Sequence, residues 1–129
     1  MCVPVGLFVW VALPIDGSAA GSRQHDCIVR DWKIAPRLAG RQPLAPGREF
    51  GPGTARVYAY AALYCPTFRG PAAFRFFHEK SRYADITVRV KPSDKWRTWA
   101  SVRALPGKWR VQLLVSGERV LEDSFVVRR

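Results

Sequence analysis

The stretch that most constrains the fold lies at residues 95–127, which hold three of the five tryptophans in the chain. Along this stretch apolar side chains alternate with basic and polar ones, and a period of two is typical of β-strands with one buried face. Two turn sequences, Leu105-Pro106-Gly107 and Ser116-Gly117, divide it. The pattern predicts three consecutive strands joined by tight turns, with one face in a core and an arginine-rich face toward solvent.

Four further segments upstream also have the composition of strands, at residues 26–33, 56–64, 74–80 and 84–91. In the second segment, small and aliphatic residues alternate with Tyr58, Tyr60 and Tyr64, which predicts an aliphatic inner face and a tyrosine outer face. The Pro- and Gly-rich residues 34–54 predict a long connection. About seven strands and no amphipathic helix indicate an all-β fold, an immunoglobulin-like antiparallel β-sandwich. The alternative is a small closed β-barrel.

The length and composition of the chain allow one domain with a real core. The sequence has 129 residues, 48% of them hydrophobic, which suits one ordinary domain. We therefore expect a single β-sandwich domain over residues 26–128.

Residues 1–20 differ in character from the rest. A nearly continuous apolar run is followed by Gly17-Ser18-Ala19-Ala20, small residues that suit a signal peptidase cutting before Gly21. No Lys or Arg precedes the apolar run. We interpret residues 1–20 as a secretion signal that lacks its basic start, with a disordered leader as the alternative.

Export to an oxidising compartment would affect the redox state of the two cysteines of the domain, Cys27 and Cys65. Two cysteines in an exported domain suggest one disulfide. Cys27 opens the first predicted strand and Cys65 closes the second, and those ends are neighbours in an antiparallel pair. Two buried free thiols are the alternative, and the sequence leaves both open.

The chain is strongly basic, with a formal net charge of +11 from 21 Lys and Arg against 10 Asp and Glu. Such a field favours anionic partners: nucleic acid, anionic lipid, acidic glycan or an acidic protein. The basic residues are spread along the chain without a long run, as on the solvated surface of any arginine-rich domain.

Tryptophan and arginine together form the sharpest constellation in the sequence. The strand phase assigns to the core Trp96, Trp109 and Phe125, and it predicts that the two tryptophans lie on adjacent antiparallel strands. The opposite face is predicted to carry Arg97, Trp99, Arg103 and Arg110. Guanidinium groups over Trp99 would form a cross-strand cation–π ladder, with each contact contributing about 0.5–2 kcal/mol. This face is interpreted either as a stabilising ladder or as a binding face.

These residues also carry a family likeness. The segments RVYAYAALY, FRFFHEK, WRTW and GKWRV, followed by Gly117 through Val127, resemble the bacterial domain of unknown function 2914 family over about residues 27–127. The resemblance implies a small β domain, often in an envelope or membrane context, and no established activity. Members usually place a histidine first in the fourth strand. Here His78 follows the phenylalanines, so no role is carried over to it.

No pattern in the sequence indicates catalysis. The chain has no H-E-x-x-H, G-x-S-x-G or Gly-rich phosphate loop. His78 and Glu79 are expected on opposite faces of a strand, and His25, Cys27, Cys65 and His78 lack the spacing of metal ligands. We therefore expect no enzyme, no cofactor and no metal site.

The sequence favours a non-enzymatic interaction module that is periplasmic or envelope-associated. Its expected partner is an anionic glycan, a lipid head group or a protein. The alternative is a basic nucleic-acid-binding β domain in the cytoplasm, where exposed Tyr58, Tyr60 and Tyr64 would stack on bases.

Overall fold

The computed structural model describes residues 27–129, which contain ten strands and no helix. Seven strands are long: β1 (Ile28–Ala35), β5 (Arg56–Cys65), β6 (Gly70–His78), β7 (Ser81–Val90), β8 (Ser93–Arg103), β9 (Gly107–Val115) and β10 (Glu118–Val127). Three are short: β2 (Arg37–Ala39), β3 (Gln42–Leu44) and β4 (Glu49–Phe50). The leader assigned to residues 1–20 lies outside the described residues.

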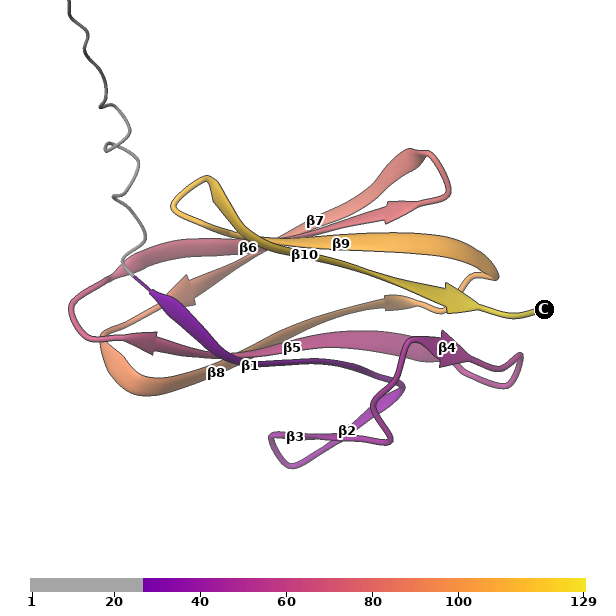
Figure 1. Ribbon diagram of the computed structural model, residues 1–129, viewed down its shortest axis with the longest axis horizontal. Helices are drawn as coiled ribbons and strands as arrows, with labels where there is room; N and C mark the ends of the chain where they lie inside the picture. The colour runs from indigo at the N-terminus through magenta and orange to yellow at the C-terminus, as the bar shows by residue number, and fades with distance from the viewer. Residues whose placement is uncertain (1–26) are drawn as a thin grey trace, which may run out of the picture.

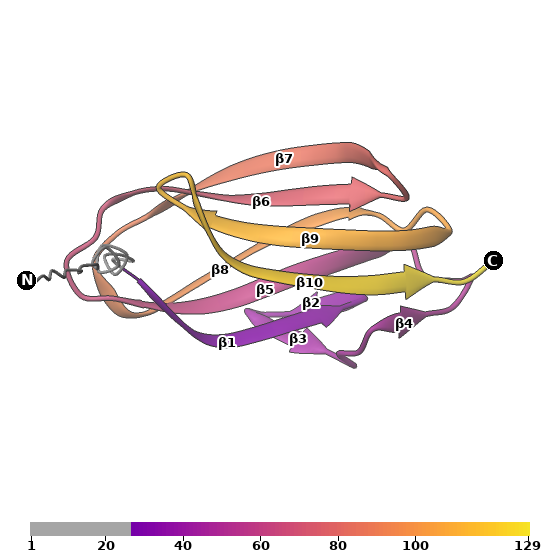
Figure 2. The ribbon, with the colours of Figure 1, turned by 45° about the horizontal axis from the view of Figure 1, so that its top comes forward.

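Two sheets pack face to face, one with the order β1-β5-β8 and the other with the order β4-β10-β9-β6-β7 (Figure 1, Figure 2). Neighbouring long strands pair antiparallel, while the short β4 runs parallel to β10. The prediction of an all-β, immunoglobulin-like sandwich is confirmed. The closed-barrel alternative is wrong, because the strands form separate sheets.

The segment predicted as a plain connection, residues 34–54, also contains structure. It forms a small hairpin of β2 and β3 and then β4 at the edge of the larger sheet. The hairpin lies against the three-stranded sheet, on the side away from the core (Figure 1). Proline and glycine keep these strands short, since Pro43 cannot donate a ladder hydrogen bond and Gly40 turns the chain at a φ of 66°.

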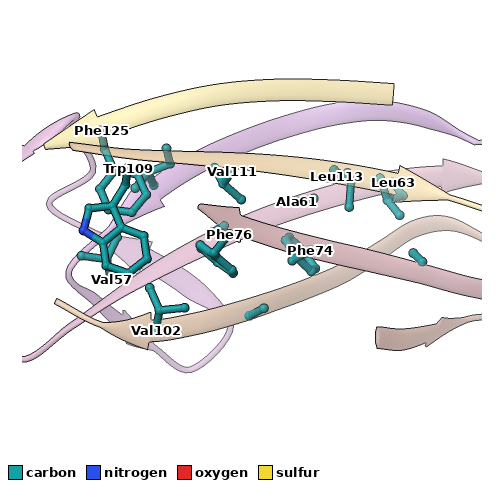
Figure 3. Close-up of a cluster of buried hydrophobic side chains, with 14 of the residues drawn as sticks. Val57, Ala61, Leu63, Phe74, Phe76, Val102, Trp109, Val111, Leu113 and Phe125 are labelled. Atoms are coloured by element: carbon teal, nitrogen blue, oxygen red, sulfur yellow. The ribbon is translucent and has the colours of Figure 1, made fainter. Parts of the chain in front are cut away.

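The core lies between the two sheets and is centred on β5. The inner side chains of β5 are Val57, Ala59, Ala61 and Leu63, as the alternation predicts. Opposite them lie the large side chains of the five-stranded sheet, including Phe74, Phe76 and Trp109 (Figure 3). Small residues on β5 leave room for these rings, so the sandwich fills without a second layer of aromatics.

Trp109 has the largest side chain among the fully buried residues of this core and is 1% exposed. Its ring stacks on Phe125, with centroids 5.6 Å apart and planes 7° apart, and meets Phe76 edge-on. Its Nε1 donates a 2.9 Å hydrogen bond to the carbonyl oxygen of Leu105. The indole is therefore packed on its faces and satisfied at its polar end. The structure thus places Trp109 and Phe125 in the core.

The prediction for Trp96 is wrong in two respects. Trp96 packs against the core but is only half-buried, at the beginning of the edge strand β8. The strands β8 and β9 also belong to different sheets, so Trp96 and Trp109 do not lie on adjacent strands. The short connection at residues 104–106 looks like a hairpin turn in the sequence, but there the chain crosses from one sheet to the other.

Cys27 and Cys65 form a disulfide at one end of the β1–β5 pair, with their Cα atoms 4.4 Å apart. The register that sets Ile28 opposite Tyr64 brings these two positions together. Of the two alternatives left open above, the structure has the disulfide. A loop with a sequence separation of 38 residues corresponds to about 3–4 kcal/mol of stabilisation in the chain-entropy model.

Replacing Trp109 by alanine is expected to lower the free energy of unfolding by about 3–5 kcal/mol, because it empties a large space in the core. Trp96→Ala is the matched control, and its effect should be clearly smaller since half-buried Trp96 loses fewer contacts. Chemical denaturation of both variants measures the difference. Equal losses in the two variants would contradict this account of the core.

Candidate functional site

The outer face of the three-stranded sheet is rich in aromatic and basic side chains. In the register, Tyr60 lies opposite Trp99 and Lys33, Tyr58 lies opposite Ser101, and Ala62 lies opposite Arg97. The β2–β3 hairpin covers part of this face, and its turn reaches toward β8.

An open pocket of about 480 Å³ lies where that turn approaches β8. Its lining residues are Arg41 from the turn and Lys95, Trp96, Arg97 and Trp99 from β8. We call it the cationic pocket. Within residues 27–129 no side-chain hydrogen bond or ion pair engages its three cations. Three positive charges and two half-buried indoles thus meet at one place on the surface.

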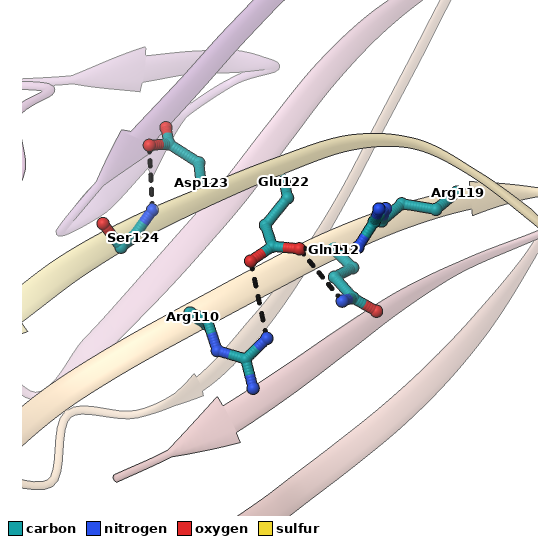
Figure 4. A network of polar contacts seen from close by, with 6 residues as sticks. All are labelled: Arg110, Gln112, Arg119, Glu122, Asp123 and Ser124. Atoms are coloured by element: carbon teal, nitrogen blue, oxygen red, sulfur yellow. Dashed lines mark hydrogen bonds and ion pairs between the residues drawn. The ribbon is translucent and has the colours of Figure 1, made fainter. Parts of the chain in front are cut away.

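The outer face of the five-stranded sheet is also basic, but several of its arginines are ion-paired with acids. Asp85 pairs with Arg75 at 3.1 Å and with Arg82 at 3.9 Å. Glu122 pairs with Arg110 at 3.4 Å (Figure 4) and with Arg119 at 3.0 Å. Hydrogen bonds from Gln112 and then Arg110 outweigh its partial burial and hold the pKa of Glu122 below its ordinary value. Arg75, Arg82, Arg110 and Arg119 are therefore each held in an ion pair with one of these two carboxylates.

The four residues predicted to share one face are divided by the structure. Arg97 and Trp99 line the cationic pocket, and Arg103 lies farther along β8, opposite Arg56. Arg110 is on the outer face of the other sheet, where it lies 4.2 Å from the ring centre of Phe77. The prediction that Arg110 joins the face is therefore wrong, because β9 pairs with β6 and β10 and not with β8.

The predicted cation–π ladder over Trp99 is also wrong. Among residues 27–129, the arginines that lie over aromatic rings are Arg30, over Tyr64 at 4.6 Å, and Arg110, over Phe77. Arg97 and Arg103 make no such contact with Trp99. Its indole is therefore not occupied by a guanidinium from the described part of the chain.

The tyrosine face is less exposed than its alternation predicts. Tyr60 is 2% exposed, and Tyr58 and Tyr64 are half-buried. The β2–β3 hairpin contacts β5 and lies over this face, which accounts for the burial of Tyr60. The same hairpin supplies Arg41, a pocket residue that sequence reasoning missed. The only signal was the Gly40-Arg41 step, a two-residue turn inside a segment read as a connection.

A second pocket, beside β1 and β10, contains Asp123, which is 15% exposed. Its Oδ2 accepts 2.9 Å hydrogen bonds from Trp32 Nε1 and Arg48 Nη2. Its Oδ1 accepts from Arg48 Nε at 2.9 Å and from the amide of Ser124 at 2.8 Å. Four donors saturate the carboxylate. Because Trp32 belongs to one sheet and Asp123 to the other, this contact ties the sheets together and is structural.

Burial disfavours the ionised form of Asp123, but the hydrogen bonds from Arg48, Trp32 and Ser124 outweigh it and hold its pKa below the ordinary value. The carboxylate is therefore stably ionised at neutral pH. Such a group stabilises the folded state and is poorly suited to take up a proton.

His78 and Glu79 do not point to opposite faces, as the strand pattern predicts. Glu79 adopts a φ of 56° and leaves the strand. Its carboxylate accepts a 2.9 Å hydrogen bond from the Lys108 amide, and His78 Nε2 lies 2.9 Å from the Pro106 carbonyl oxygen. Both contacts hold the crossover to β9. They also leave no room for a Cβ at Gly107, whose φ is 136°.

The described residues contain no group of three or more His, Cys, Asp or Glu side chains arranged to hold a metal ion. Residues 27–129 also include no helix long and apolar enough to cross a membrane.

The fold and the cationic pocket together define a small immunoglobulin-like β-sandwich with a basic, aromatic surface site. Among solved structures, the chain is similar to an immunoglobulin-like protein from Pseudomonas aeruginosa, with a TM-score of 0.57 and 13% sequence identity. The match covers 81% of this chain and 98% of that one. At this identity the likeness concerns the fold alone.

Residues 73–125 match the family described as "Protein of unknown function (DUF2914)". The resemblance stated from the sequence motifs is thereby confirmed over these residues, which run from within β6 to within β10. No curated protein matches the sequence of this chain.

Asp123→Asn is expected to lower the free energy of unfolding at neutral pH. The free energy of unfolding of the variant should also fall less on acidification than that of the parent protein. The pKa of Asp123 is lower in the folded state, so its contribution is present above the unfolded value of about 3.9. It is lost as the pH falls through the folded pKa. Denaturant unfolding at pH 7 and below pH 4 measures this.

The stability difference between Asp123→Asn and the parent protein should shrink in acid. Arg48→Ala should behave in the same direction, because it removes two donors to the same carboxylate. A difference that stays constant across this pH range would show that Asp123 is not the group responsible.

Proposed function

We propose that this protein is a non-enzymatic, envelope-associated interaction module that binds an anionic partner through the cationic pocket. One observation carries the proposal. Arg41, Lys95 and Arg97 converge beside two indoles without an ion pair to any of the described residues, whereas four arginines of the five-stranded sheet are ion-paired. Unpaired cations keep their donors and their field available to a ligand.

The envelope location is supported by three features. A disulfide between buried cysteines suits an oxidising compartment. Residues 1–20 have the composition of a secretion signal, although they lie outside the described residues. The family likeness is to domains often found in an envelope context.

The non-enzymatic role rests on how the polar groups of the sandwich are used. Asp123 and Glu122 are engaged in hydrogen bonds and ion pairs that bind the strands together. His78 and Glu79 hold the crossover to β9. These groups serve the fold, while the unpaired cations lie at the pocket.

The cytoplasmic nucleic-acid alternative is weakened by the burial of Tyr60. Single-strand binders stack successive bases on exposed aromatic side chains. With Tyr60 covered and Arg30 lying over Tyr64, the row of tyrosines does not provide such a platform.

Retention on heparin is expected to weaken by about two- to fivefold in each of three single variants, Arg41→Ala, Lys95→Ala and Arg97→Ala. The reason is that an exposed ion pair contributes up to about 1 kcal/mol. The triple variant should elute at clearly lower salt. The loss should be largest at low ionic strength, where charges are least screened. Salt-gradient elution measures it.

Arg119→Ala is the control for these variants, because it removes one positive charge from the other sheet. Its retention should stay near that of the parent protein once melting temperatures are shown to match. If Arg119→Ala loses as much retention as Arg97→Ala, binding follows net charge alone and the pocket is not the site.

The proposed location predicts the chemistry of the mature protein. Expressed in a Gram-negative bacterium and fractionated, the protein should be periplasmic and begin at Gly21. Under non-reducing conditions its mass should be lower than that of the reduced form by two hydrogens. Intact Met1 in the cytosol, with both thiols free, would argue against the envelope.

A further inference from the structure

We infer that the cationic pocket takes one acidic sugar unit of a polysaccharide, a pyranose ring bearing a carboxylate or sulfate. This inference rests on the proposed function and names its ligand. In it, Trp99 is the platform for the ring, and Arg41, Lys95 and Arg97 receive the anionic groups.

The geometry of β8 arranges these groups in a row. Lys95, Arg97 and Trp99 lie at alternate positions of the strand and therefore on one face. Successive members of the row are about 7 Å apart along the strand. Arg41 approaches from the hairpin, so cations of two elements surround the pocket that Trp99 and, from the other phase of β8, Trp96 line. A ligand in the pocket meets a flat apolar surface and charges around its rim.

A pyranose ring with an acidic substituent matches this surface in both respects. Its C–H groups form a flat apolar face that packs on an indole, and an indole offers a large rigid area for such contact. Its carboxylate or sulfate accepts paired hydrogen bonds from a guanidinium. The Trp99 indole is half-buried and carries no guanidinium from the described residues, so it is positioned for a ligand.

The size of the pocket suits a short portion of a chain. Its volume of about 480 Å³ lies within the range of about 300–1,000 Å³ that small-ligand sites occupy. Because the pocket is open to solvent at an edge strand, a polysaccharide can continue beyond the bound unit. The pocket therefore binds one sugar unit, and this unit can lie within the polysaccharide as well as at its end.

Two other anionic partners fit less well. Single-stranded nucleic acid is held along a groove with several stacking platforms, whereas here the neighbouring Tyr60 is covered. A membrane surface is bound by exposed apolar side chains beside the cations. The large exposed hydrophobics of residues 27–129 are Ile28, Leu44 and Tyr83, and none of them lines the pocket.

The test uses the full chain and three probes: oligogalacturonate, a neutral oligosaccharide of equal length, and polyphosphate. Titration calorimetry should show binding of oligogalacturonate and much weaker binding of the neutral sugar. Trp99→Ala should weaken oligogalacturonate binding by about tenfold, or 1.4 kcal/mol, and leave polyphosphate binding unchanged. Trp99→Phe should restore part of the loss. Arg119→Ala should alter neither.

The outcomes separate the two proposals. If oligogalacturonate and polyphosphate bind alike and Trp99→Ala affects neither, the pocket is a charge patch; the sugar inference fails and the proposed function stands. If neither these probes nor heparin binds, both fail. Tighter, Trp99-dependent binding of single-stranded DNA or of anionic lipid vesicles would also overturn the sugar inference, in favour of that partner.

Discussion

The packing of Trp109 beneath the crossover at residues 104–106 is the interaction on which the rest of this structure depends. The indole fills the core against Phe125 and Phe76, and its Nε1 hydrogen-bonds to the carbonyl oxygen of Leu105 within the crossover itself. These contacts fix the point where the chain leaves one sheet and enters the other. Once β8 and β9 are in different sheets, their outward side chains must lie on opposite sides of the molecule.

That separation explains the distribution of charge. Both outer faces are basic, but the acidic residues Asp85 and Glu122 lie among the arginines of the five-stranded sheet. On the outer face of the three-stranded sheet Asp31 pairs with Lys33, and no ion pair within the described residues engages Arg97 on β8. The net charge of the chain therefore does not tell where the unpaired cations lie. The sheet order is needed to see which arginines have an acidic partner.

Periodicity predicts faces much better than it predicts partners. The inward positions of β5 and of β8, such as Val57 and Val102, follow from alternation alone, and the family motifs coincide with strands. Strand pairing does not follow, because a three-residue connection can close a hairpin or cross between sheets. For that reason the alternation pattern wrongly predicts Arg110 beside Trp99. Alternation also overestimates the depth of Trp96, since it gives the face of a side chain and not how far along the strand the core extends.

The β2–β3 hairpin shows why the candidate site could not be predicted in full. Its proline and glycine content is typical of a connection, yet the segment folds back over the three-stranded sheet and changes two properties at once. It buries Tyr60, which removes a stacking platform, and it carries Arg41 to the side of β8, which completes the pocket. Both effects arise from contacts between residues distant in sequence. A long insertion between the first two main strands is therefore a place to look for binding residues in sandwiches of this kind, because the chain there is free to cover an outer face that the core does not constrain.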